Sequence, residues 1–326
     1  MHCFVTGVTG FIGSHVAAAL LDRGDTVTGL TSTRSNVREL EASGIAPVVG
    51  DIRNPDGWAD TAAESDVVVH TAQLPLPRRP TRRFVDRTIE AERTHLSHLL
   101  PRLGSSTAFV YTSGIGIYGA GEWVNDERYP TDPFVRSRKD LVAERMVLDA
   151  VADHGVRATV LRPAPVYGPG GLFDRFWGRR LAAGKRAAYA GCGDQVWSFV
   201  SIWDCARAYL CAIDTPTTGE VFNVTDDEPV SLRTFLSAMA EAMDAPEPFG
   251  VPKPLFRALA GPVFSEPMFS SFPATGDRIR DRLGFEPLYP TYRDGTVAAA
   301  RAYAGEPHLA DRRGRSPPVS PRPRSG

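Results

Sequence analysis

The chain has 326 residues, of which 42% are hydrophobic and 23% are charged, the composition of an ordinary globular protein with a sizeable core. Its formal net charge is −1, so the overall balance favours neither nucleic acid nor an anionic membrane as a partner. No apolar run approaches the roughly 20 residues that cross a bilayer. Four scattered cysteines and a strand-like run from the second residue onward predict a cytoplasmic protein with reduced thiols and no signal peptide.

Short apolar runs alternate with amphipathic stretches through the first half of the chain. We expect strands at 2–6, 26–30, 46–49, 67–70, 108–112 and 159–162, with helices at 12–23, 84–103 and 139–154. Such alternation predicts right-handed crossovers and a parallel sheet with helices on both faces. The predicted fold class is therefore α/β, a doubly wound parallel sheet of the Rossmann type.

A glycine-rich loop follows the first predicted strand and opens the first predicted helix. Gly7 permits a tight turn, Gly10 lets the backbone approach a pyrophosphate, and Gly13 lets helix and strand pack closely. The N-terminus of the helix then points its unpaired N–H groups at the phosphates. The loop predicts a bound nicotinamide dinucleotide, contacted by the three glycines and by Thr9, Phe11 and Ile12.

The end of the second predicted strand indicates which dinucleotide is bound. A carboxylate ~20 residues past the glycines would hydrogen-bond the ribose 2′-hydroxyl and repel a 2′-phosphate. This chain carries Thr31, Ser32 and Arg34 there, and no acid. Hydroxyl groups and a guanidinium suit a 2′-phosphate, so we expect NADP(H), with NAD(H) less favoured. The alternative for Arg34 is a solvated position on the loop.

The rhythm changes after about Pro163, where Pro, Gly and aromatic residues become frequent. We expect residues 1–168 and about 199–225 to form the dinucleotide-binding domain, with strands at 199–200 and 221–224 returning to the main sheet. Residues about 169–198 and 226–304 then form a smaller interleaved C-terminal substrate lobe. Residues 305–326, rich in Pro and Arg, cannot bury enough apolar area to offset their ordering entropy, so we expect a disordered basic tail.

Further motifs resemble the extended short-chain dehydrogenase/reductase family, which includes NAD-dependent epimerase/dehydratases. Besides the glycine loop they are Gly50-Asp51-Ile52, His70-Thr71-Ala72, Tyr111-Thr112-Ser113 with Tyr118-Gly119, Leu161-Arg162-Pro163 with Val166-Tyr167-Gly168, Trp197-Ser198-Phe199-Val200 with Asp204, and Leu283-Gly284-Phe285. The resemblance covers roughly residues 2–303. It implies that Asp51 and Ile52 contact the adenine, that Thr71, Ala72 and Gln73 line the cofactor, and that Pro163 and Val166 lie near the nicotinamide.

The resemblance also implies a catalytic tyrosine, a lysine four residues later and a serine or threonine, and here the sequence departs from the family. The position four residues before Lys139 is Val135, and the position four residues before Arg138 is Phe134. The hydroxyl position falls on Gly114. We expect the catalytic residues among Thr112, Ser113, Tyr118, Arg138 and Lys139, with Tyr129 and Tyr167 as further phenols.

The motifs of the fold are present, whereas the tyrosine–lysine pattern of the family reaction is absent. Three functions are compatible with this combination. The favoured one is an NAD(P)-dependent oxidoreductase acting on a carbonyl or hydroxyl of a small, aromatic or polyketide-like metabolite. The second is an epimerase or dehydratase that uses its cofactor transiently. The third is a non-redox cofactor-binding protein, such as a cyclase, an isomerase or a sensor.

The second half supplies the expectations about substrate, metal and partners. The apolar run 262–273 is expected to cover the substrate pocket as a lid, together with aromatic residues from 173–177 and 197–199. No His, Cys, Asp or Glu spacing along the chain matches a metal site, so no metal is expected. The partners we expect are a small-molecule substrate and, because family members often dimerise through two helices (here 84–103 and 139–154), a second copy of the chain.

Overall fold

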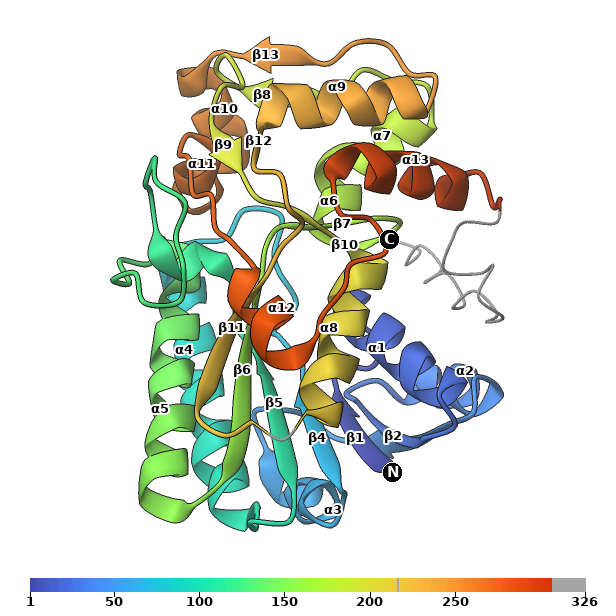
Figure 1. Ribbon diagram of the computed structural model, residues 1–326, viewed down its shortest axis with the longest axis vertical. Coiled ribbons are helices and arrows are strands. Elements are labelled where there is room, and N and C mark those ends of the chain that lie inside the picture. The colour runs from blue at the N-terminus through green and yellow to red at the C-terminus, as the bar shows by residue number, and fades with distance from the viewer. Residues whose placement is uncertain (216, 307–326) are drawn as a thin grey trace.

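A computed structural model of the chain describes residues 1–215 and 217–306 (Figure 1). A seven-stranded, wholly parallel sheet lies at its centre, in the order β11-β6-β5-β4-β1-β2-β3. The strands are β1 (His2–Thr6), β2 (Thr26–Thr31), β3 (Ile45–Val49), β4 (Val67–His70), β5 (Ala108–Thr112), β6 (Arg157–Pro163) and β11 (Glu220–Val224). The predicted doubly wound α/β fold is confirmed. The predicted tail lies outside the described residues except for its first two positions.

Helices cover both faces of the sheet, as parallel strands require. On one face lie α1 (Phe11–Asp22), α2 (Val37–Ala42) and α8 (Ile202–Asp214), and on the other lie α3 (Ala59–Ala63), α4 (Arg82–Leu99) and α5 (Arg138–His154) (Figure 1). The helices α4 and α5 pack against each other along their length. No helix among the described residues is long and apolar enough to cross a membrane.

The helix ends follow local chemistry that can be read from the chain. The Thr81 hydroxyl accepts a hydrogen bond from the Phe84 N–H and caps α4, while α5 ends at Gly155 in the left-handed region. At the start of α8, Ser201 accepts from the Asp204 N–H. The Asp204 carboxylate in turn accepts from the Leu288 N–H at 2.6 Å, which ties the segment around Leu288 to this helix.

The loop between β1 and α1 lies directly on the segment that follows β4. Gly7 has φ 71°, and a Cβ atom there would lie 2.7 Å from the backbone of Ala72. A Cβ on Gly13 would lie 2.3 Å from the Gly7 carbonyl oxygen. The Thr71 hydroxyl donates to the Thr6 carbonyl at 2.7 Å and locks the two segments together. The turn and the close packing expected of Gly7 and Gly13 are therefore both present.

The two strands expected to return to the main sheet have different outcomes. The run 221–224 does so, as β11 beside β6. The prediction for 199–200 was wrong, because β10 (Val200–Ser201) pairs instead with β7 (Val166–Tyr167) in a separate two-stranded ladder. Apolar character alone cannot distinguish a strand of the main sheet from a short buried ladder at its edge.

The remaining elements gather above the carboxyl ends of the sheet strands, apart from α12, which packs on β11 (Figure 1). A π-helical turn at Asp174–Gly178 joins the first two helices of this lobe. The elements are α6 (Gly171–Phe173), α7 (Arg179–Ala182), β8 (Ala188–Ala190), β9 (Val196–Trp197), β12 (Val230–Ser231), α9 (Leu232–Ala242), β13 (Phe249–Val251), α10 (Lys253–Ala260), α11 (Pro262–Met268), α12 (Asp277–Leu283) and α13 (Tyr292–Tyr303).

One buried carboxyl group gives the fold a pH dependence. Asp226 follows β11, is 3% exposed, and its Oδ2 has no hydrogen-bond partner among the described residues. Burial raises the pKa of Asp226 to about 8. Its folded-state pKa therefore exceeds the unfolded value near 3.8, so the folded state binds the extra proton and loses stability as the pH rises from about 4 through 8.

We expect Asp226→Asn to stabilise the protein at alkaline pH, because the amide needs no ionisation in a site that resists charge. The gain should be about 1–3 kcal/mol at pH 9, and it should vanish near pH 4. Thermal unfolding of both proteins from pH 4 to 9 measures it. A variant whose Tm stays below that of the wild type by the same amount at every pH would contradict the assignment.

Candidate active site

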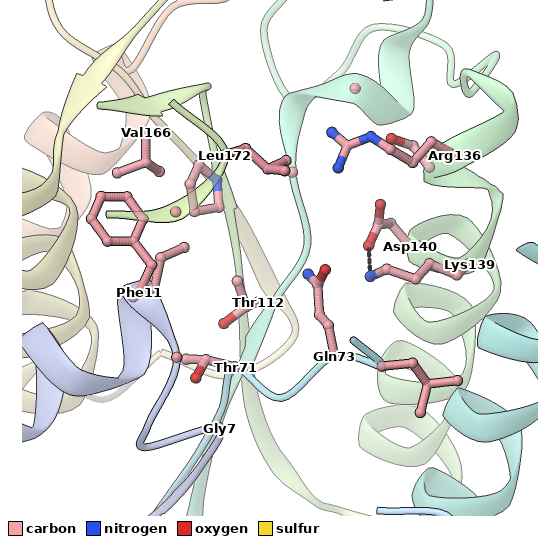
Figure 2. Close-up of a pocket in the computed structure, with 18 of the residues that line it drawn as sticks. Gly7, Phe11, Thr71, Gln73, Thr112, Arg136, Lys139, Asp140, Val166 and Leu172 are labelled. Atoms are coloured by element: carbon pink, nitrogen blue, oxygen red, sulfur yellow. Dashed lines mark hydrogen bonds and ion pairs between the residues drawn. The ribbon is translucent and has the colours of Figure 1, made fainter. Parts of the chain in front are cut away.

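A cavity of about 1040 Å³ opens at the carboxyl ends of the sheet strands, between the glycine loop and the upper lobe (Figure 2). Its floor comes from the turns after β1, β2, β4, β5 and β6, and its roof comes from α6, the π-helical turn and α11. Open α/β sheets bind ligands at this edge. The volume exceeds what a small metabolite alone needs and suits a dinucleotide with a substrate beside it.

Nearly all the residues expected to bind the cofactor line this cavity. They are Gly7, Thr9, Gly10, Phe11, Ile12, Gly13, Thr31, Ser32, Asp51, Ile52, Thr71, Ala72, Gln73, Pro163 and Val166. Arg34 is the exception, because it lies exposed at the start of the 3₁₀ turn η1 (Arg34–Asn36) and is not a lining residue. Arg53, which the sequence reasoning missed, does line the cavity, and its guanidinium holds the Asp51 carboxylate at 2.5 and 3.0 Å.

The start of α1 has the features needed to hold phosphates. Its N-cap is Gly10, so no side chain caps the first N–H groups of the helix. A Cβ on Gly10 would already lie 3.0 Å from the Gly7 carbonyl oxygen, and Gly10 lines the cavity. Unpaired N–H groups at a helix start, together with the helix dipole, bind anions. The residues present therefore fit the pyrophosphate of a dinucleotide.

Two hydroxyl groups at the end of β5 differ in availability. The Thr112 hydroxyl is 2.7 Å from the Tyr209 hydroxyl of α8 and is already engaged. The Ser113 hydroxyl lines the cavity, is largely buried, and has no hydrogen-bond partner among the described residues. An unpaired buried hydroxyl beside a cavity is suited to a ligand oxygen. Ser113 is thus the better placed of the two sequence candidates.

Tyr118 and Arg138 do not lie in the cavity, which corrects their assignment as catalytic candidates. The Tyr118 phenol donates to Asn223 and accepts from Arg162, both at 2.8 Å. Arg162 also binds both oxygens of the Glu144 carboxylate, so the four side chains join β6, α5, β11 and the turn after β5. Burial raises the pKa of Tyr118 to about 12, which makes the phenol a poor acid.

Arg138 is exposed at the first turn of α5 and is not a lining residue. The next residue, Lys139, is buried and does line the cavity. The sequence alone left both frames open.

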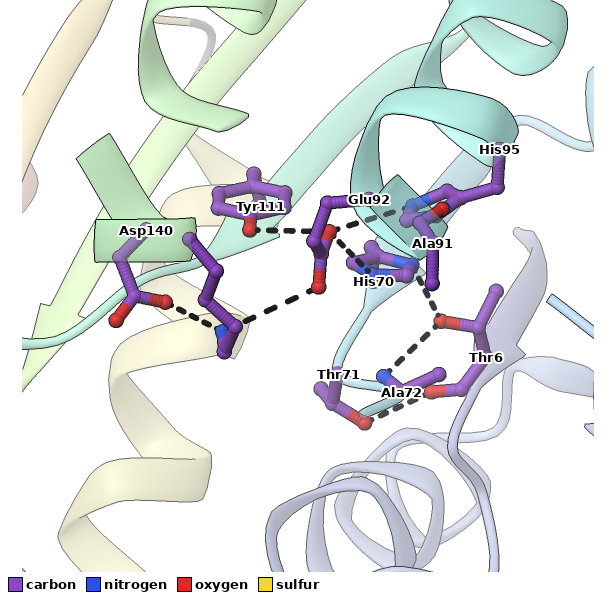
Figure 3. Close-up of polar contacts among 10 residues, drawn as sticks. Thr6, His70, Thr71, Ala72, Ala91, Glu92, His95, Tyr111 and Asp140 are labelled. Carbon is purple, nitrogen blue, oxygen red and sulfur yellow. Dashed lines mark hydrogen bonds and ion pairs between the residues drawn. The ribbon is translucent and has the colours of Figure 1, made fainter. Parts of the chain in front are cut away.

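Lys139 is held by carboxylates from two helices. Its ammonium lies 2.5 Å from Asp140 and 3.9 Å from Glu92 of α4 (Figure 3). Burial lowers the pKa of Lys139, but the two carboxylates outweigh burial, so the pKa lies above its ordinary value. The lysine therefore carries its charge at neutral pH. It can orient a cofactor hydroxyl group and attract negative charge, but it releases a proton reluctantly.

The cavity contains an arginine that the sequence reasoning did not consider. Arg136 belongs to the 3₁₀ turn η5 (Val135–Ser137), and its guanidinium points into the cavity above Lys139 and Asp140 (Figure 2). Val135, four residues before Lys139, does not line the cavity, and its N–H donates to Glu266 of α11 at 2.7 Å. Arg136 lies three residues before Lys139, so its place in the sequence beside a catalytic candidate could have indicated that it reaches the cavity.

No phenol hydroxyl of the described residues is presented to the cavity as an acid. Tyr167 is the one lining tyrosine, but its hydroxyl lies against Gly295 of α13, where an added Cβ would come within 1.6 Å of it. Tyr129 is exposed and packs edge-on against Tyr118. The tyrosine-dependent proton transfer expected of the family is therefore not available from these side chains.

The substrate side of the cavity has aromatic walls. Lining residues include Phe173, Phe176, Trp177, Trp197, Phe199, Phe264, Met268 and Phe272, all of them anticipated from the sequence. Phe264 packs edge-on against Phe176 with centroids 5.1 Å apart, and Phe272 does so against Phe134 at 5.3 Å. The run 262–273 thus contributes to the roof of the cavity as α11 and the segment after it. Phe269 points elsewhere, against Phe256.

Behind Lys139 the fold assembles a buried cluster that spacing along the chain did not reveal. Glu92 lies 3.7 Å from the Nε2 atoms of both His70 and His95, and it accepts from the Tyr111 hydroxyl at 3.3 Å (Figure 3). Nδ1 of His95 faces the Ala91 carbonyl and must donate to it, so Nε2 carries a lone pair when the ring is neutral. Burial keeps the pKa of both histidines low.

His70, Glu92 and His95 have the atoms to ligate a metal ion, since their ligand atoms lie within 4.8 Å of one another. The Lys139 ammonium beside Glu92 opposes a divalent cation there. We therefore keep the expectation of no metal.

Purified protein should contain well under one equivalent of zinc by elemental analysis, and chelator should leave its Tm unchanged. Stoichiometric zinc that is lost in His95→Ala would show the opposite.

The fold and the cavity define a nicotinamide dinucleotide enzyme of the short-chain dehydrogenase/reductase type. Residues 3–225 match the model of the NAD dependent epimerase/dehydratase family, so the chain belongs to that family. The resemblance inferred from the motifs is confirmed, although the tyrosine and the frame around it depart from the family pattern.

Relatives and solved structures give the family context. A 3-diazoavenalumate denitrifying reductase from a Streptomyces species is 31% identical over 306 residues, which cover 90% of this chain and 99% of that protein. A 4-hydroxy-2-methyl-3-oxo-4-farnesyl-3,4-dihydroquinoline-1-oxide ketoreductase from Stigmatella aurantiaca is 26% identical, covering 74% and 73% of the two chains. The structure of a UDP-glucuronic acid 4-epimerase from Bacillus cereus with NAD has a TM-score of 0.75 at 23% identity, covering 94% and 99%, which establishes the shared fold.

Proposed function

We propose that the protein is an NADPH-dependent reductase of a small aromatic metabolite. The observation that carries the proposal is the lining of the cavity. The glycine loop lies at one end of the cavity, and aromatic side chains line the other end. Two relatives, a denitrifying reductase and a ketoreductase, support reduction of the substrate as the direction of the reaction. A site lined by aromatic side chains suits a planar substrate better than a nucleotide sugar, because sugars need many polar partners.

The choice of NADPH rests on the absence of an acid at the end of β2 and on nearby cations. Ser32 lines the cavity there, and Arg53 lies close enough to line it too. Arg34 is exposed and makes no described ion pair, so it has freedom to reach a 2′-phosphate from outside the cavity. A 2′-phosphate would gain charge-assisted hydrogen bonds from either guanidinium.

We expect the wild type to bind NADPH at least ~10-fold more tightly than NADH, the factor typical of one charge-assisted contact. Fluorescence titration gives both dissociation constants. Arg34→Ala and Arg53→Ala, made singly and together, should weaken NADPH but not NADH, whereas Arg38→Ala on the exposed face of α2 should change neither. Equal affinities of the wild type for the two cofactors would exclude the NADP preference.

The groups around the reacting centre suggest how reduction proceeds without a tyrosine. A bound reduced nicotinamide supplies a hydride. Ser113 can donate its unpaired hydroxyl hydrogen to a substrate carbonyl oxygen, and the charged Lys139 stabilises the negative charge that develops there. The apolar side chains of the roof lower the local dielectric and so strengthen both interactions. The final proton would come from solvent.

A second candidate reaction is favoured by the missing phenol and by the similarity to a denitrifying reductase of a diazo compound. Reduction of an arenediazonium group by one hydride gives the arene C–H bond and N₂, while the cofactor is oxidised. No alkoxide forms in that reaction, so no acid beside the substrate oxygen is required. A cavity with aromatic walls and no presented phenol suits it.

Two substrates separate the reactions. We expect NADPH consumption with 4-formylbenzoate for a carbonyl reductase, and with benzenediazonium-4-carboxylate, giving benzoate and N₂, for a denitrifying reductase. Both are corrected for the rate without enzyme. Ser113→Ala should lower kcat/KM for the aldehyde by roughly 10- to 100-fold, as loss of one oxyanion donor does, and should scarcely affect the diazonium compound. Ser97→Ala, on the exposed side of α4, is the control. If the wild type consumes NADPH with neither substrate, the proposed function is contradicted.

A further inference from the structure

Arg136 is a cation without a described partner in a cavity where the carboxylates are already paired. Among the described residues it makes no hydrogen bond and no ion pair. The lining carboxylates are Asp51, held by Arg53, and Asp140, held by Lys139. Five N–H donors of a guanidinium are therefore left for a ligand.

The surroundings of Arg136 make an unpaired charge unfavourable. Burial lowers the pKa of Arg136, and the nearby Asp140 only partly opposes it. Arginine cannot give up its proton near neutral pH, so its site is stabilised by an incoming anion rather than by neutralisation. Further lining cations add to the positive potential, and they are Arg79, Arg83 and Arg87 of the loop before α4 and its first turns.

The position of Arg136 separates it from the phosphates of the cofactor. Figure 2 shows it across the cavity from Gly7 and Phe11, where the start of α1 accounts for the pyrophosphate. Its turn is instead attached to the aromatic roof, because Glu266 of α11 accepts from the N–H of the preceding residue and Phe134 packs on Phe272. The guanidinium thus faces the space left for the substrate.

We propose that Arg136 binds an anionic group of the substrate, and that the substrate is an aromatic acid held between this guanidinium and the aromatic roof. A carboxylate fits the guanidinium fork with two parallel hydrogen bonds. The inference rests on the proposed function for the identity of the reacting molecule, but the anion site itself is independent of turnover. Arg136 then sets which substrates are accepted, while Ser113 and Lys139 face the reacting group.

The binding experiment uses the full chain loaded with NADP⁺ and compares cinnamate with cinnamamide by isothermal titration calorimetry. The two probes share size and shape and differ in charge. The wild type should bind cinnamate roughly 10- to 100-fold more tightly, as expected for one charge-assisted pair in a partly buried site. Arg136→Met should remove the preference and leave cinnamamide unchanged, and Arg136→Lys should keep part of it. Arg145→Met, on the exposed side of α5, is the matched control.

A wild type that does not prefer cinnamate, including one that binds neither probe, overturns the proposal. So does an Arg136→Met variant that keeps the preference, since another cation would then carry it. A variant that weakens both probes equally, with a Tm close to that of the wild type, indicates a packing role and also overturns it. If Arg136→Met does not fold, the partial preference of Arg136→Lys decides.

Turnover distinguishes substrate binding from stabilisation of the reacting oxygen. With 4-formylbenzoate and its methyl ester, Arg136→Met should raise KM for the acid and leave kcat for the ester unchanged. An equal loss of kcat for both compounds assigns Arg136 to the reacting oxygen and overturns the anion site. If neither aldehyde is reduced by the wild type, carbonyl reduction fails as a function while the calorimetric comparison still decides the anion site.

Discussion

The close contact between the β1–α1 loop and the segment after β4 is the constraint on which the site depends. At Gly7 and Gly13 even a methyl group would collide with backbone atoms. The contact brings the start of α1 to the edge of the sheet, and it sets the floor of the cavity where Thr71 and Ala72 lie. Because β4 lies between β1 and β5 in the sheet, the turns that follow these three strands meet at this floor.

The turn before α5 departs from the residue pattern that the family resemblance implies, while the parallel sheet and the glycine loop are kept. Lys139 lines the cavity as a charged lysine, held by Asp140 and Glu92. Four residues earlier, Val135 brings no phenol, and its N–H is bound to the roof helix α11. The side chain that enters the cavity from this turn is the guanidinium of Arg136. This turn therefore offers the cavity a permanent cation and no phenol, which favours recognition of an anion over transfer of a proton.

Most of the fold was predictable from the sequence, because strand patterns and glycine spacing express local rules. The run 221–224 was correctly expected to join the main sheet, but 199–200 was not placed correctly, since pairing partners are decided by the whole fold. For the site, the motifs near the glycine loop identified residues that do line the cavity. Tyr118 was misjudged because its two hydrogen-bond partners, Arg162 and Asn223, come from distant segments. The clustering of His70, Glu92 and His95 was invisible for the same reason.

The bond between the Val135 N–H and Glu266 has a consequence for how the enzyme matures. The parallel sheet is complete once β11 has been made, whereas the aromatic roof requires residues 264–272. The bond joins residues that lie 131 positions apart in the sequence, and contacts of such long separation carry a large loop-closure entropy cost. We therefore expect the roof to be the part of the cavity that closes last during folding and opens first on local unfolding.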